Sequence, residues 1–232
     1  MLRDLSKEVK ENTMYKNQPG VVLRMHAKPG IGNALFELTT NLHYTGDPDG
    51  PVEWVLCKPN DDPDTLWAFE FYKDEESFTR HYSNPAMDDG HEKVINLLAD
   101  MPLRADVHIA VSSCETDTDA PVVKENTMYK NQPGVVLRMH AKPGMGDALF
   151  ELTTNLHYTG DIDGPVDWVL CRTNDDPDTL WAFEFYKDEE SFTRHYSNPS
   201  MDDGHEKVID LLSDMPLRAD VHIVVSSCAS GA

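Results

Sequence analysis

Residues 65–72 read T-L-W-A-F-E-F-Y, and the same eight residues recur at 179–186. The aromatic content favours a β-strand, and apolar side chains fall on both of its faces, as expected for a strand that is covered on both sides. The repeat extends far beyond this strand, because residues 9–114 reappear as 123–228 with only ten differences among 106 aligned positions. A repeat of this length indicates a duplicated domain rather than the shorter unit of a solenoid.

The duplication predicts a dimer fused into one chain, since most soluble oligomers are two-fold symmetric homodimers. Each copy is long enough to bury a core of its own. The segment 115–122, E-T-D-T-D-A-P-V, is acidic and lacks aromatic residues, and it is predicted to link the domains 9–114 and 123–228. Association of the fused pair into a higher oligomer stays open.

The fold class follows from the order of elements within one copy. The pattern predicts strands at 21–28, 52–57, 65–72 and 103–111, with helices at 32–42, 74–83 and 85–99. This order is the ferredoxin-like split βαβ arrangement, an α+β unit with a four-stranded antiparallel sheet and helices on one face. Because the other face of each sheet needs a cover, the two copies are expected to pack sheet to sheet as an intramolecular pseudo-dimeric α/β barrel.

Charge and composition narrow the class of partner. The net charge of −21 argues against nucleic acid or an anionic membrane as a partner, because both would be repelled. No run approaches the roughly 20 apolar residues of a membrane-spanning helix, and residues 1–8 lack the apolar run of a signal peptide. The four cysteines favour reduced thiols in the cytoplasm over a disulfide framework, with a Cys57–Cys114 bridge as the open alternative.

Several common chemistries have no motif in this chain. The sequence has no glycine-rich phosphate loop, no G-x-S-x-G elbow, no C-x-x-C pair and no H-E-x-x-H helix. In the run D-D-G-H, Asp88 and His91 form only one i,i+3 pair on a helix, and exposed acids explain that run more simply than a metal does. No metal site is therefore predicted.

Four segments of each copy carry a family resemblance: R-M-H-A-K-P-G (24–30), N-D-D-P-D (60–64), W-A-F-E-F-Y (67–72) and K-D-E-E-S-F-T-R-H-Y-S-N-P (73–85). Together they resemble the antibiotic biosynthesis monooxygenase family, which belongs to the dimeric α/β-barrel superfamily. The resemblance spans about 20–112 and again 134–226. It implies one pocket in each copy, between the sheet and the helices.

The resemblance also implies a chemistry. The founding members oxidise aromatic polyketide intermediates without metal or flavin, because an electron-rich phenolate or enolate can itself pass an electron to dioxygen. The protein then supplies a dry cavity and groups that bind and deprotonate the substrate. We therefore expect a cofactor-independent monooxygenase-like enzyme whose partners are a small hydrophobic metabolite and dioxygen. A non-enzymatic small-molecule-binding protein of the same fold is the alternative from another class.

Other relatives bind and degrade haem, which is a second alternative. They use a histidine that matches His91 and an aromatic residue that matches Tyr72, where tryptophan stands in the relatives. Their asparagine on the first strand falls near Leu23 in this chain. Two of the three features are therefore altered or missing, so no cofactor is expected and haem remains the alternative.

The candidate catalytic residues are Glu70, Tyr72 and His91 in copy one and Glu184, Tyr186 and His205 in copy two. An unpaired carboxylate within an apolar strand would be costly, so Glu70 either pairs with a base such as Arg24 or Arg104 or has a raised pKa for proton transfer. Tyr72 shares its face by the period of two, and His91 can shuttle a proton. The structural alternatives are a tyrosine hydroxyl that only satisfies its neighbour and a histidine that is merely exposed.

A second set of residues is expected to bind substrate. It consists of Trp54, Trp67 and His81 with their counterparts Trp168, Trp181 and His195. The two indoles can line a cavity for a planar ligand, although core packing is the favoured explanation for them. For His81 the open alternative is a capping or packing role in its helix.

Overall fold

The computed structural model describes residues 17–113 (copy one below) and residues 131–227 (copy two). The expected linker lies outside the described residues, and so does Cys114, on which the alternative disulfide depends. Copy one contains β1 (Pro19–His26), α2 (Gly32–His43), β2 (Glu53–Pro59), β3 (Thr65–Phe71), α3 (Glu75–Tyr82), α4 (Pro85–Leu97) and β4 (Leu103–Ser112). Copy two repeats them as β5 (Pro133–His140), α5 (Gly146–His157), β6 (Asp167–Thr173), β7 (Thr179–Phe185), α6 (Glu189–Tyr196), α7 (Pro199–Leu211) and β8 (Leu217–Ser226). The predicted order of elements is confirmed.

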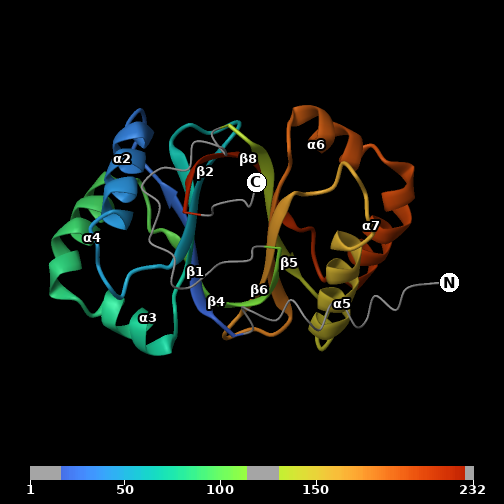
Figure 1. Ribbon diagram of the computed structural model, residues 1–232, viewed down its shortest axis with the longest axis horizontal. Helices are drawn as coiled ribbons and strands as arrows, with labels where there is room; N and C mark the ends of the chain where they lie inside the picture. Colours follow the sequence, from blue (N-terminus) through green and yellow to red (C-terminus); the bar gives the residue numbers. More distant parts are fainter. Residues whose placement is uncertain (1–16, 114–130, 228–232) are drawn as a thin grey trace.

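The strands form one closed barrel in the order β1-β3-β2-β8-β5-β7-β6-β4. Each copy supplies an antiparallel four-stranded sheet, and the two sheets join where β2 pairs with β8 and β4 pairs with β6. This pairing removes the open edges that a single sheet would expose. Figure 1 shows the barrel in the middle, with α2, α3 and α4 on one side and α5, α6 and α7 on the other. The predicted pseudo-dimeric α/β barrel is confirmed.

The position of β3 between two hydrophobic cores explains why its residues are apolar on both faces. Trp67, Phe69 and Phe71 belong to the core inside the barrel, where side chains from both copies meet. Leu66 and Ala68 belong to the separate core between the sheet and the helices of copy one. Because side chains alternate along a strand, Glu70 lies on the helix side of the sheet.

Local capping fixes where the helices that follow this strand begin. The Asp74 side chain accepts a hydrogen bond of 2.7 Å from the backbone N–H of Ser77 and so caps α3. The Asn84 side chain accepts one of 3.0 Å from Ala86 N–H and caps α4, in which proline occupies the first turn. Both arrangements follow the usual preferences of helix N-termini. They place His81 in the last turn of α3 and His91 within α4.

Candidate functional site

Each copy holds a cavity of about 280 Å³ between its sheet and its helices. The apolar part of the wall in copy one consists of Leu23, Met25, Leu42, Met87, Val94 and Leu98. The polar end consists of His43, Glu70, His81, Tyr82, His91 and Arg104. Ile95 also lines the cavity and is 59% exposed, so the cavity reaches the surface there. Every lining residue has the same identity in copy two, so the two cavities are equivalent in composition.

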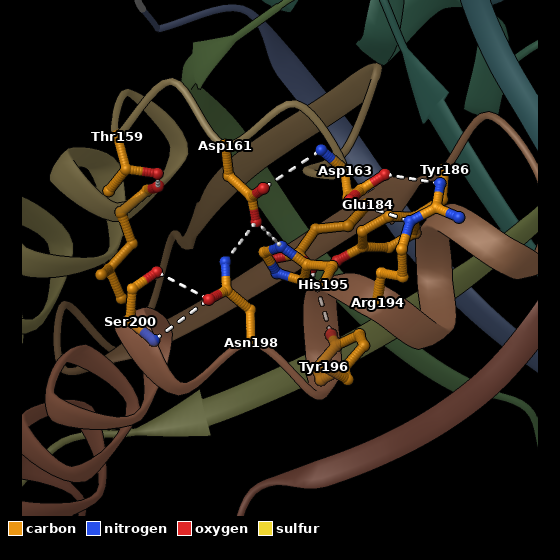
Figure 2. Close-up of polar contacts among 11 residues, drawn as sticks. Thr159, Asp161, Asp163, Glu184, Tyr186, Arg194, His195, Tyr196, Asn198 and Ser200 are labelled. Atoms are coloured by element: carbon orange, nitrogen blue, oxygen red, sulfur yellow. Dashed lines mark hydrogen bonds and ion pairs between the residues drawn. The ribbon is translucent and has the colours of Figure 1, made fainter.

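Glu70 is the buried anchor of the polar end. Its Oε2 accepts hydrogen bonds from the Tyr72 hydroxyl at 2.8 Å and from the Tyr82 hydroxyl at 3.3 Å. Its Oε1 lies 3.1 Å from Nε2 of His43. Figure 2 shows the equivalent contacts of Glu184 with two tyrosines in copy two.

Glu70 is paired with a base as expected, but the base is His43 and not Arg104, and the alternative of a raised pKa is wrong. Arg104 binds Asp106 instead of this carboxylate, with 2.7 Å between Nε and Oδ1. Burial alone would raise the pKa of Glu70, but the His43 ring and the Tyr72 hydroxyl outweigh burial and lower the pKa to about 2. The carboxylate is therefore ionised and held by donors, which makes it an anchor rather than a proton acceptor.

His43 is one of the site residues that sequence reasoning missed. It ends α2, and its Nδ1 lies 2.8 Å from the backbone carbonyl oxygen of Thr39. Its ring lies 4.4 Å from the Trp54 ring, between centroids. A signal was present, because His43 follows Thr39 by four residues and therefore shares the sheet-facing side of the helix.

His91 presents a free imidazole to the cavity. Among the described residues its side chain has no hydrogen-bond partner, and its ring stacks at 6.1 Å from the Tyr82 ring. Burial, followed by the neighbouring His81 ring, lowers the pKa of His91. The ring is therefore neutral near pH 7, with one nitrogen that donates and one that accepts.

Arg104 brings a fixed positive charge to the same end. Its guanidinium group lies 4.2 Å from the centre of the Tyr82 ring, a cation–π distance. Because an arginine side chain keeps its proton at any physiological pH, the apolar cavity ends on a cation. Its Nε already donates to Asp106, so an anionic oxygen of a ligand would meet the remaining N–H groups of the guanidinium.

His81 is oriented by a second carboxylate. Its Nδ1 lies 2.9 Å from Oδ2 of Asp47, and both side chains are 7% exposed. Asp47 belongs to the loop between α2 and β2. His81 lines the cavity, as does Glu70 on the neighbouring strand.

The structure places the expected site residues in three groups. Glu70, His81 and His91 line the cavity, and their counterparts Glu184, His195 and His205 line its twin. Tyr72 and Trp54 do not line the cavity but contact residues that do: Tyr72 donates a hydrogen bond to Glu70, and Trp54 packs on His43. Tyr186 and Trp168 make the same contacts in copy two. Trp67 and Trp181 face one another at 5.8 Å inside the barrel, on the opposite side of the sheet from the cavity.

Two absences concern the described residues only. Residues 17–113 and 131–227 contain no group of three or more His, Cys, Asp or Glu side chains that could hold a metal ion. Within the same two ranges, none of the helices is both long enough and apolar enough to cross a membrane.

Residues 20–93 and, separately, residues 134–207 match the model of the antibiotic biosynthesis monooxygenase family. The chain belongs to this family. The two matches cover corresponding parts of the two copies, so the chain is a tandem duplication of one family domain. No curated protein matches the chain.

Solved structures share the duplicated architecture of this family member. A candidate monooxygenase from Fusobacterium nucleatum subsp. nucleatum is 18% identical with a TM-score of 0.76, and the match covers 94% of this chain and 98% of that one. A candidate monooxygenase from Lactobacillus acidophilus is 11% identical with a TM-score of 0.70, covering 91% and 96%. An anthrone oxidase-like protein is 10% identical with a TM-score of 0.69, covering 93% and 95%. At these identities the likeness shows a shared monooxygenase-like fold.

Proposed function

We propose that each copy is a cofactor-independent monooxygenase-like site for a small hydrophobic metabolite, aromatic or polyketide-like, with an ionisable hydroxyl group. The supporting observation is an apolar cavity whose polar end carries three imidazoles and one guanidinium beside the Glu70 carboxylate and the Tyr82 hydroxyl. Such a pocket buries a ring system and directs one polar group of the ligand to the charged end. The volume of about 280 Å³ is at the low end of ligand pockets, which span roughly 300–1,000 Å³, and favours a small substrate.

The proposed reaction begins with proton transfer. An imidazole of the polar end takes a proton from the substrate, and Arg104 stabilises the phenolate or enolate that remains. This anion passes one electron to dioxygen, and the two radicals combine to form a peroxide on carbon. Protonation of the peroxide and loss of the remaining C–H proton break the O–O bond. One oxygen atom stays on carbon as a carbonyl and the other leaves as water, so that a CH2 group and dioxygen become a carbonyl group and water.

The candidate catalytic residues then take different roles. We assign His91 to contact with the substrate oxygen, because its ring nitrogens have no partner among the described residues and it lines the cavity. Glu70 acts through its neighbours, since both of its oxygens already face donors. Tyr72 does not line the cavity, and its contribution is to hold Glu70.

A panel experiment tests this function. The protein, treated with a chelator, is incubated with hydroxylated aromatic compounds and small polyketides under isotope-labelled dioxygen, and products are followed by mass spectrometry. The expected result is a product that carries one labelled oxygen atom and that does not form under nitrogen. Binding without conversion of any compound would instead support the non-enzymatic alternative.

The haem alternative has weaker support from the residues. His91 offers an imidazole, but Tyr72 lies behind Glu70 and Leu23 supplies no polar group where the haem degraders carry asparagine. These residues do not fit the arrangement of the haem-degrading relatives. A Soret band that saturates at one haem per copy and disappears in the variant His91→Ala with His205→Ala would overturn this assignment.

A further inference from the structure

His81 and Asp47 form a hydrogen-bonded pair at the wall of the cavity, and they come from different elements. His81 lies in the last turn of α3, whereas Asp47 lies in the loop between α2 and β2. Nδ1 of His81 and Oδ2 of Asp47 are 2.9 Å apart, and each side chain is 7% exposed. Copy two repeats the pair at the same 2.9 Å between His195 and Asp161 (Figure 2).

Asp47 is held as an ionised acceptor. Its Oδ1 accepts a hydrogen bond of 3.1 Å from the backbone N–H of Asp49, and its Oδ2 lies 3.5 Å from Nδ2 of Asn84. Burial alone would raise the pKa of Asp47, but the backbone N–H and the His81 ring outweigh it and lower the pKa. An ionised carboxylate can only accept hydrogen bonds, so Nδ1 of His81 must carry the hydrogen.

The other nitrogen of the ring is therefore available to a ligand. With Nδ1 protonated, Nε2 of the neutral ring carries a lone pair. Nε2 has no hydrogen-bond partner among the described residues, and His81 is one of the residues that line the cavity. A buried carboxylate that orients an imidazole in this way also stabilises the imidazolium formed when Nε2 takes a proton.

The loop that carries Asp47 is fastened beside the pair. The Arg80 guanidinium donates to Oδ1 of Asp49 from Nε at 3.0 Å and from Nη2 at 2.8 Å. Arg80 and His81 are adjacent on α3, so one turn of helix holds both acids of the run D-P-D. Pro51, a few residues further along the same loop, lines the cavity.

From this geometry we propose that His81 is the general base of the cavity and that Asp47 is its positioning residue, with His195 and Asp161 in copy two. The proposal rests on the proposed function, in which an unspecified imidazole takes the first proton. In the step, the substrate O–H bond breaks, its electron pair stays on oxygen, and the proton forms a bond with Nε2. His91 then donates a hydrogen bond to the new anion instead of acting as the base.

Other titratable and charged groups lie around the His81 ring, and each must stay in place in a test. The titratable or charged groups around His81 are Asp47 from the loop, the chain neighbours Arg80 and Tyr82 on α3, Glu70 on β3, Tyr72 directly after β3, and His91 from α4. Replacing Asp47 with asparagine keeps the shape of the side chain but removes its charge. The amide nitrogen of the asparagine can then donate a hydrogen bond to Nδ1. The ring hydrogen moves to Nε2, which can no longer accept a proton from the substrate.

The test uses para-nitrophenol, whose phenolate absorbs at a longer wavelength than the phenol, and does not require oxygenation. The full chain and the variants Asp47→Asn with Asp161→Asn are titrated with it below the pKa of the free phenol. The expected result is that the full chain binds the phenolate form, whereas the variants bind the phenol or bind at least tenfold more weakly. The matched control is Asp61→Asn with Asp175→Asn, the same change at exposed positions that do not line either cavity, and it should behave like the full chain.

The outcomes separate this proposal from the proposed function. If the variants bind phenolate as the full chain does, or if the full chain binds no para-nitrophenol, the base assignment is overturned. If phenolate binding depends on Asp47 but no compound is oxidised, the base stands and the oxygenase function fails.

Nitrogen NMR of labelled histidine gives a second reading in the unmodified chain: a neutral His81 with hydrogen on Nδ1 is expected, and hydrogen on Nε2 would contradict the assignment. Where a substrate is oxidised, the Asp47 variants should also lose the low-pH limb of kcat/KM that the control retains.

Discussion

His43 and Glu70 form a buried ion pair at the inner end of the cavity: Nε2 of His43 lies 3.1 Å from Oε1 of Glu70, with side chains 4% and 10% exposed. Nδ1 of the same ring lies 2.8 Å from the Thr39 carbonyl oxygen. Because a carbonyl only accepts hydrogen bonds, Nδ1 carries a hydrogen. Nε2 therefore faces the carboxylate, whose pKa the His43 ring and the Tyr72 hydroxyl lower.

This ion pair predicts how stability depends on pH. The folded pKa of Glu70 is about 2, below the ordinary value of 4.5, so its ionisation stabilises the fold above about pH 4.5. That contribution is lost as the pH falls from 4.5 towards 2. Glu70→Gln with Glu184→Gln should lower the free energy of unfolding near pH 7 by about 3–5 kcal/mol per copy, as expected when one partner of a buried pair is removed.

Urea denaturation at several pH values measures this effect. The difference between the unmodified chain and the Gln variant should shrink as the pH falls below 4.5, because protonation removes the same charge. The exposed residues Glu75 and Glu189 provide a control, since their replacement by glutamine should leave the curve unchanged. A difference that is constant from pH 7 to pH 2 would show that the carboxylate charge does not act as described.

The loop of the base pair differs between the copies at one position. Asp47 and Asp49 flank Pro48 in copy one, whereas the equivalent residue of copy two is Ile162, which is 95% exposed. The two loops make the same contacts to α3 and α6. Ile162→Pro should therefore stabilise the chain by about 0.4–1 kcal/mol, because proline restricts the unfolded state.

Thermal denaturation checks the loop prediction. Pro48→Ile, the reverse change in copy one, should destabilise by a similar amount, and neither variant should change ligand binding. A loss of stability in Ile162→Pro would mean that the loop of copy two has a different backbone from that of copy one.

Trp67 should matter for the barrel and not for the ligand. It packs against Trp181 at 5.8 Å inside the barrel, on the far side of the sheet from the cavity. Trp67→Phe should lower the free energy of unfolding by about 0.5–3 kcal/mol and leave the Kd of a cavity ligand unchanged. Trp54→Phe is the matched comparison, because that indole packs on His43 and its loss should weaken the ligand. Isothermal titration calorimetry measures the Kd of the ligand for each variant. A changed Kd in the Trp67 variant would mean that ligands enter the barrel.

Much of the fold could be predicted because its causes are local. The apolar side chains on both faces of residues 65–72 indicated that both faces are covered. The duplication indicated that the second copy covers the face opposite the helices. Element ends shifted by only one or two residues, as for β1, which begins at Pro19 rather than at residue 21. The pairing between β2 and β8 was not predicted, because no residue pattern in either strand specifies which strand of the other copy it pairs with.

The site was predicted less completely, for two physical reasons. Trp67 and Glu70 are three residues apart on the third strand, so their side chains lie on opposite faces and cannot line one cavity. Trp67 was nevertheless a ligand-binding candidate, because only its aromatic character was considered. Asp47 had no periodic signal, because it lies in a loop whose path depends on Arg80 and His81, far along the chain. Contacts of this kind appear only when the chain is folded.

The two cavities are predicted to be separate, equivalent sites in one chain, and the kcat of single-copy and double-copy variants tests this most directly. His81→Gln alone or His195→Gln alone should halve kcat per chain at saturating substrate, because the lining residues are identical in both copies. The two changes together should lower kcat by about 10²-fold or more, the usual loss when a general base is removed. Full activity in the double variant, with its fold intact by circular dichroism, would contradict catalysis in these cavities.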